Sequence, residues 1–90
     1  MLKVHRVINM EGWAMTVIEL RRLYQDKQLI EAIIESSSED EVWIVEFRHN
    51  RGGLVLLTDE NGKECHYQDV DDASRSALDV GFKQVRIANK

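Results

Sequence analysis

The segment from residue 42 to residue 67 limits the possible folds of this chain more than any other part of the sequence. Residues 42–49 (VWIVEFRH) place Trp43, Val45 and Phe47 on one face and the more polar set, which includes Glu46 and Arg48, on the other. This pattern is typical of a half-buried strand. Two turn signals follow, the run 50–53 (NRGG) and the dipeptide Asn61-Gly62, which type I′ hairpin turns prefer. The pattern predicts a three-stranded antiparallel meander with strands at 42–49, 54–59 and 63–67.

Turns of two residues would also set the register of this meander. With Asn61-Gly62 as a turn, Glu60 pairs with Lys63, and with Arg51-Gly52 as the other turn, Phe47 pairs with Leu56. The face expected to meet the core then carries Trp43, Val45, Phe47, Leu54, Leu56, Thr58, Cys65 and Tyr67. The other face carries Ile44, Val55 and Leu57 together with Glu46, Arg48, Asp59, Glu64 and His66.

Helix signals flank the predicted meander. Thr16 and Glu19 have capping-box spacing, so a helix should begin at Val17 and continue either as one bent helix to Glu35 or as two short helices hinged near Gln25-Asp26. A second helix should follow Asp69, which can act as its N-cap, and end before Gly81. Its buried residues are expected to be Val70, Ala73, Ala77 and Leu78.

The rest of the chain completes a single domain over residues 1–90. Residues 2–8 and 82–88 are expected to be terminal strands, with Val85 and Ile87 pointing inward, whereas 9–12 should form a turn and 36–41 an acidic loop. The predicted order is β-α-β-β-β-α-β. This order is typical of an α+β fold with a mainly antiparallel sheet, a three-stranded meander plus N- and C-terminal strands, and helices packed on one face.

The charge balance and the apolar runs exclude several classes of protein. Twelve basic and sixteen acidic residues give a net charge of −4, which disfavours non-specific binding to nucleic acid or to an anionic membrane. The single cysteine, Cys65, permits no internal disulfide, and the N-terminal residues lack the apolar region of a signal peptide. We therefore expect a cytoplasmic protein.

Few residues are candidates for catalysis or metal binding. Cys65 and His66 are adjacent on a predicted strand, so their side chains should point to opposite faces and cannot act as a pair. His5, His49 and His66 match no zinc-ligand spacing, and we expect neither a metal nor a cofactor. Glu46 and His66 should share a sheet face on either side of Leu57, where an acid and a base could perform general acid–base catalysis in a small enzyme.

Two features indicate possible contacts with nucleic acid. Trp43, Phe47 and Tyr67 on one sheet face are similar to a base-stacking platform, although helices are expected to cover that face. The densest basic segment is the hairpin tip, whose candidate binding residues are Arg48, His49, Arg51, Gly52 and Gly53. Lys83, Arg86 and Lys90 would extend this patch if the last strand lay beside it.

Residues 42–53 (VWIVEFRHNRGG), the run 69–75 (DVDDASR) and Gly81-Phe82 resemble short uncharacterised bacterial proteins of plasmids and integrative elements, some labelled as plasmid-replication proteins. The resemblance runs from Leu29 onward and carries no catalytic motif. It implies a role in plasmid or mobile-element replication or maintenance.

The interpretation that best fits these patterns is a non-enzymatic interaction or regulatory module that forms a homodimer. The predicted interface is the second sheet face, with Ile44, Val55, Leu57 and His66, because no third layer is expected to cover it. The alternatives are a nucleic-acid accessory protein that uses the hairpin tip and a small enzyme that uses Glu46 and His66.

Overall fold

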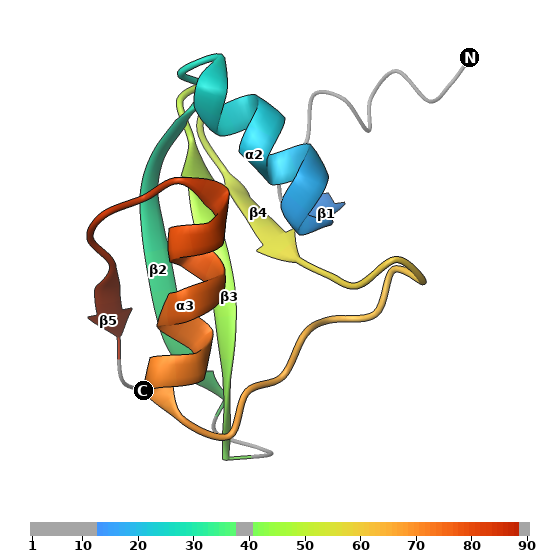
Figure 1. Cartoon of the computed structure of the whole chain (residues 1–90), viewed down its shortest axis with the longest axis vertical. Coiled ribbons are helices and arrows are strands. Elements are labelled where there is room, and N and C mark those ends of the chain that lie inside the picture. Colours follow the sequence, from blue (N-terminus) through green and yellow to red (C-terminus); the bar gives the residue numbers. More distant parts are fainter. Residues whose placement is uncertain (1–12, 38–40, 89–90) are drawn as a thin grey trace.

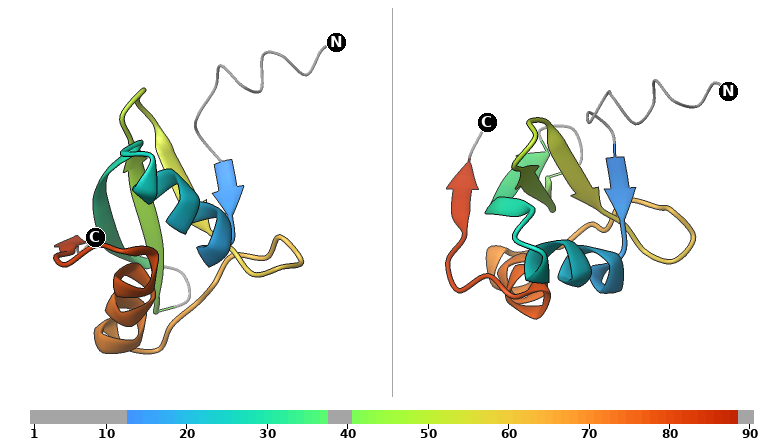
Figure 2. Two further views of the ribbon diagram at one scale, coloured as in Figure 1. Left: turned by 45° about the horizontal axis from the view of Figure 1, so that its top comes forward. Right: turned by 90° about the horizontal axis from the view of Figure 1, so that it is seen from above.

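A computed structural model describes residues 13–37 and 41–88 of the chain (Figure 1). Both helices lie on the same face of a five-stranded sheet, which confirms the α+β class and the one-sided packing of the helices (Figure 2). The elements in chain order are β1 (Trp13–Met15), α2 (Val17–Gln25), β2 (Leu29–Ser37), β3 (Val42–His49), β4 (Leu54–Leu57), α3 (Val70–Val80) and β5 (Arg86–Ala88).

The sheet is mixed, whereas the sequence predicted a mainly antiparallel one. Its strand order is β1-β4-β3-β2-β5. The three central strands pair antiparallel, and the two three-residue edge strands, β1 on β4 and β5 on β2, pair in parallel. The parallel pairings arise because each edge strand is linked to the central strands through a helix, a connection that parallel strands require.

The first helix begins as predicted and ends earlier. The Thr16 hydroxyl accepts a hydrogen bond from the Glu19 N–H (3.3 Å), and the Glu19 carboxylate accepts one from the Thr16 N–H (2.9 Å), which is the complete capping box. The helix stops at a Schellman motif with Lys27 in the left-handed region at φ 62°. The predicted helix to Glu35, as one piece or two, is therefore wrong.

The segment after this stop forms β2. Three isoleucines among its first six residues favour extended backbone because β-branched side chains are restricted in a helix. Ala32 and Ile34 point into the core, and Ile33 lies on the opposite face. Ser36 and Ser37 belong to this strand rather than to the predicted loop.

The second helix has the predicted ends. Asp69 accepts a hydrogen bond from the Asp72 N–H at its start, and Gly81 follows its last residue with φ 138°. Ala73, Ala77 and Val80 face the core, whereas Leu78 is 50% exposed, so its predicted burial is wrong. The main core cluster is Leu20, Leu29, Ala32, Ile34, Val45, Phe47, Val55, Leu57, Ala73, Ala77 and Val80.

The predicted register of β4 is wrong by one residue. Phe47 pairs with Val55, so Val55 and Leu57 are buried beneath the helices and Leu54 and Leu56 lie on the opposite face. The cause is a three-residue loop, closed by the hydrogen bond from the His49 N–H to the Gly53 carbonyl. Because side chains alternate along a strand, one extra loop residue reverses every side chain of β4.

The second turn also contains one residue more than predicted. The Asp59 N–H donates to the Lys63 carbonyl, and Thr58 forms a bridge with Glu64 instead of Cys65. The Asp59 carboxylate accepts hydrogen bonds from the N–H groups of Asn61 and Lys63, which stabilises this longer loop. Residues 63–67 form only isolated bridges, so the predicted third strand of the meander is absent there.

The observed order, β-α-β-β-β-α-β, equals the predicted one for partly different reasons. The sequence predicted no strand at the positions of β1 and β2. It did predict a strand at residues 63–67, where the structure has none. The last strand is limited to 86–88. Val85 packs against the core, and Ile87 aligns with the core residue Ile34 on the helix-covered face, as predicted, but is 46% exposed at the edge of the sheet. The predictions for 2–8 and 9–12 lie outside the described residues, as does Lys90.

Candidate interaction surfaces

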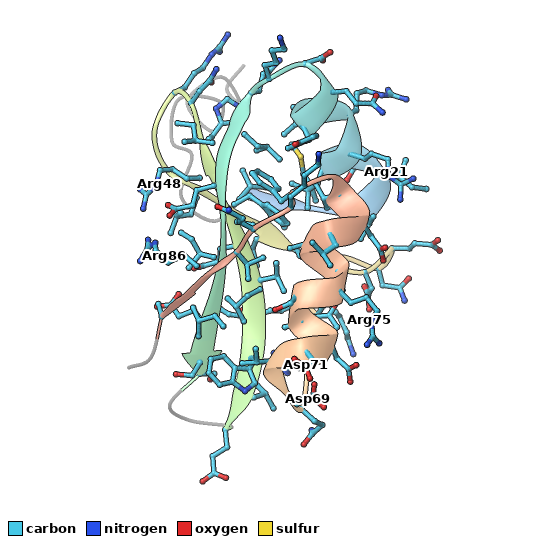
Figure 3. All side chains as sticks on the ribbon, turned by 60° about the vertical axis from the view of Figure 1, so that its left-hand side comes forward. Arg21, Arg48, Asp69, Asp71, Arg75 and Arg86 are labelled. Atoms are coloured by element: carbon cyan, nitrogen blue, oxygen red, sulfur yellow. The ribbon has the colours of Figure 1, made fainter. Side chains whose placement is uncertain are left out.

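The sheet face opposite α2 and α3, here called the outer sheet face, carries a mixed surface. Its central row consists of Ala14, Leu56, Glu46, Ile33 and Arg86, each aligned with the next across the sheet. Neither helix covers this face, and Figure 3 shows Arg48 and Arg86 on the opposite side of the sheet from Arg21 and Arg75 of the helices. Other members of the face include Glu31, Glu35, Ile44, Arg48, Leu54 and Ala88.

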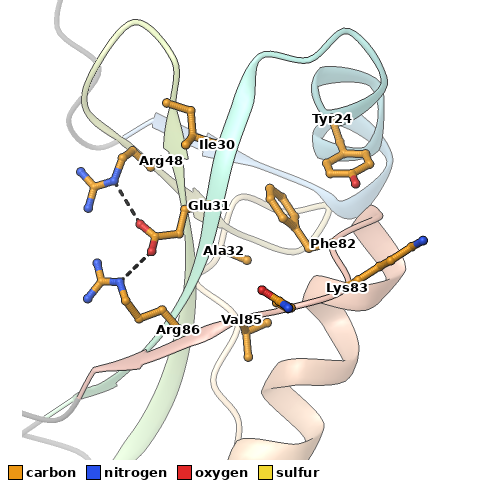
Figure 4. Close-up of a pocket in the computed structure, with 10 residues that line it drawn as sticks. Tyr24, Ile30, Glu31, Ala32, Arg48, Phe82, Lys83, Val85 and Arg86 are labelled. Atoms are coloured by element: carbon orange, nitrogen blue, oxygen red, sulfur yellow. Dashed lines mark hydrogen bonds and ion pairs between the residues drawn. The ribbon is translucent and has the colours of Figure 1, made fainter.

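A carboxylate holds two arginines together on this face. Glu31 accepts hydrogen bonds from Nε of Arg86 (2.8 Å) and from Nε of Arg48 (3.2 Å), and so links β2 to strands on both sides. Arg86 and, more weakly, Arg48 hold the pKa of the Glu31 carboxyl below its usual value, and Glu31 raises the pKa of Arg86. The Nη groups of both guanidiniums point away from Glu31 (Figure 4).

A groove of about 600 Å³ follows the edge of β2 beside this ion-pair cluster (Figure 4). Arg48, Glu31 and Arg86 lie on one side of β2, and Tyr24 and Phe82 lie on the other. The aromatic side is firmly packed, because the Phe82 ring lies 4.7 Å from the Tyr24 ring and 5.7 Å from the Phe47 ring, measured between centroids. The remaining lining residues are Ile30, Ala32, Lys83, Gln84 and Val85.

The structure separates the predicted nucleic-acid-binding residues of the hairpin tip. Arg48 is paired with Glu31, and the His49 side chain is 3% exposed, with Nδ1 accepting a hydrogen bond from the Arg51 N–H (3.1 Å). Arg51 and Gly52 are exposed, and Gly53 is partly buried. The hairpin tip therefore forms no continuous basic surface. The last strand does lie near the tip, as the predicted extension of the basic patch required, because Arg86 and Arg48 both pair with Glu31.

The predicted pair Glu46 and His66 is not aligned with Leu57. Glu46 lies opposite Leu56 on the outer sheet face, whereas the Leu57 side chain is buried in the core. His66 Nε2 lies 2.9 Å from Glu64 Oε1, in the segment after β4. The register shift therefore removes the geometric basis of the predicted acid–base pair.

The thiol and the aromatic platform belong to the core side of the sheet. Cys65 packs against the core, and burial raises the pKa of its thiol, which disfavours the nucleophilic thiolate. Trp43, Phe47 and Tyr67 contact or belong to the same core, and the Tyr67 hydroxyl bonds the Ser76 hydroxyl at 2.7 Å. Helix α3 thus occupies the position where a stacked base would have to lie.

The predicted interface residues have different positions. Ile44 lies on the outer sheet face as expected, but Val55 and Leu57 are 0% and 1% exposed, so they contribute nothing to that surface. Sequence reasoning missed Leu54, Leu56 and the Glu31 cluster. The adjacent glycines at 52–53 could have indicated the correct register of β4, because a three-residue hairpin loop needs a residue with positive φ.

Within the described ranges, no group of three His, Cys, Asp or Glu side chains could hold a metal ion, and no helix is long and apolar enough to cross a membrane. A scan against protein-family models and a search of curated proteins find no match to the chain. The resemblance to proteins of plasmids and integrative elements therefore stays a prediction.

Proposed function

We propose that the protein is a small cytoplasmic, non-enzymatic interaction module that forms a homodimer through its outer sheet face. The observation that carries this proposal is the composition of that face. Ile44, Leu54 and Leu56 are partly exposed there, and no helix among the described elements covers them. Apolar side chains gathered on an uncovered sheet face are typical of protein-binding surfaces.

The charges of the same face favour a second copy as the partner. A two-fold interface must be complementary to itself, and the outer sheet face carries both signs, with Glu31, Glu35 and Glu46 beside Arg48 and Arg86. A two-fold rotation can therefore place carboxylates of one copy near guanidiniums of the other. Stacking the two sheets would also bury the apolar residues between them.

The test is the mass of the particle in solution, measured by sedimentation equilibrium and native mass spectrometry. The wild type is expected to be a dimer and the Leu56→Lys variant a monomer, because a lysine at the centre of the interface would be buried against its copy. In the single chain this lysine lies opposite Glu46, so the strand itself gains a favourable pair.

Leu78→Lys is the matched control, since Leu78 is 50% exposed on α3, away from the outer sheet face. It should remain a dimer. A wild-type monomer at micromolar concentrations, or a Leu56→Lys variant that is folded and still dimeric, would exclude the outer sheet face as the interface.

A further inference from the structure

We infer that the groove along β2 binds a short extended segment of a partner protein in which acidic and apolar side chains alternate. The groove shares Arg48 and Arg86 with the outer sheet face, but its strand edge and its aromatic wall lie beyond the proposed dimer interface. The first observation is that β5 pairs only with residues 33–35 of β2. Residues 29–32 have β3 on one side and no described strand on the other, so part of the strand edge remains open. Extended peptides bind such edges through main-chain hydrogen bonds.

The length of the open edge limits the segment. Four residues of strand span about 13 Å at about 3.3 Å per residue. A β-bulge between Leu29 and Glu31 turns Ile30 outward, where its side chain is 58% exposed and lines the groove. Regular pairing therefore begins after the bulge, and the bound segment is short.

The two walls of the groove specify the side chains of the segment. Successive residues of a strand point to opposite faces, so one set would meet Arg48 and Arg86 and the other set would meet Tyr24 and Phe82 (Figure 4). The groove carries three cations, the two arginines and Lys83, against the single carboxylate of Glu31. A segment with carboxylates on one side and aliphatic side chains on the other is complementary to both walls.

The probe is a blocked pentapeptide of alternating glutamate and valine, added to isotope-labelled full-length protein and followed by two-dimensional NMR. Shift changes are expected at the amides of Ile30–Ala32 and of Lys83–Arg86. A peptide with lysine in place of glutamate should bind much more weakly. A third peptide, N-methylated at the central valine, should lose binding because strand addition needs that backbone donor.

Two arginine variants test the charge argument. Arg86→Gln should weaken binding of the glutamate peptide about three- to tenfold, since it removes one cation from the groove. The matched control is Arg75→Gln, which also removes an arginine that is paired with a carboxylate, that of Asp72. Arg75 lies on the surface of α3, outside the groove, so this variant should bind the peptide as the wild type does. The monomeric Leu56→Lys variant should still bind the peptide, which would show that the groove binds its ligand without the dimer.

The inference fails if the glutamate peptide shifts none of these amides at millimolar concentration. Equal binding of the lysine peptide would refute the charge argument, and equal binding of the N-methylated peptide would refute strand addition. Either result would overturn the proposed ligand without affecting the measured mass of the particle.

Discussion

At the scale of single residues, Gly81 shows how one position joins the two helices. It follows α3 with φ 138°, and a Cβ built there would lie 2.5 Å from Cδ2 of Tyr24. We expect Gly81→Ala to lower the free energy of unfolding by about 2–4 kcal/mol, because it adds both backbone strain and a clash with the ring of α2. Urea denaturation measures this loss.

The control for Gly81 is Gly52→Ala at the hairpin tip. Gly52 also has positive φ, 99°, but a Cβ added there would meet nothing within 4 Å, so only the strain applies and the expected loss is about 1 kcal/mol. Equal losses for the two variants would show that the contact with Tyr24 is unimportant.

His49 makes the stability of the hairpin depend on pH. Burial and, more weakly, Arg51 lower the pKa of the imidazole in the folded chain, and Nδ1 must stay unprotonated to accept the Arg51 N–H. The unfolded chain, with a histidine pKa of about 6.5, then takes up the proton more readily, so stability is complete above pH ~6.5 and declines as the pH falls toward the folded pKa.

The direct measurement for His49 is an NMR titration of its imidazole, together with urea denaturation at several pH values. His49→Asn keeps a side-chain acceptor near the Arg51 N–H and should flatten the pH dependence of stability between pH ~7 and ~5.5. A folded-state pKa at or above the ordinary histidine value would contradict this account.

At the scale of elements, the register of β4 gives a direct comparison between neighbouring residues. Leu57→Lys would bury a charge in the core and should lower the free energy of unfolding by about 4 kcal/mol or more, enough to leave a domain of this size largely unfolded. Leu56→Lys places the same side chain on the outer sheet face and should change the monomer by about 1 kcal/mol at most. In the register predicted from two-residue turns, Leu56→Lys would be the more destabilising variant. Denaturation followed by circular dichroism distinguishes the two registers.

The elements that the sequence predicted correctly are those with local chemical signals. The Thr16–Glu19 capping box, the Asp69 N-cap and the alternation of 42–49 each depend on residues a few positions apart, and the structure confirms all three. The features that the sequence did not predict depend on the backbone conformation of one residue or on the length of one loop. Lys27 ends α2 in a conformation usually taken by glycine, and one extra residue in each loop changes the strand that follows.

The candidate surfaces were harder to predict than the elements for the same reason. The sequence did identify Ile44, Arg48 and Arg86 as surface candidates. It could do so because β3 was predicted correctly and a strand was expected near the end of the chain. The role of Glu31 could not, because it lay in a segment assigned to a helix. Its contacts with Arg48 and Arg86 exist only once β2 is a strand between β3 and β5.

At the scale of the whole molecule, self-association and stability should be coupled. A chain of 90 residues has a small core, and burying the outer sheet face against a second copy would add to its stability. Because a dimer unfolds to two chains, mass action makes its melting temperature rise with protein concentration. We expect a hundredfold increase in concentration to raise the Tm of the wild type by about 5 °C or more, and that of Leu56→Lys hardly at all.

Differential scanning calorimetry at several concentrations measures this coupling, and Leu78→Lys should behave like the wild type. Arg86→Gln removes one cation from the groove and from the outer sheet face. It leaves Ile44, Leu54 and Leu56 unchanged, so the Tm of this variant should still rise with protein concentration. A wild-type Tm that is independent of concentration, in a protein that sediments as a dimer, would mean that the folded monomer is stable alone and that the dimer adds little free energy. The outer sheet face would then be a weak contact that contributes little to the stability of the fold.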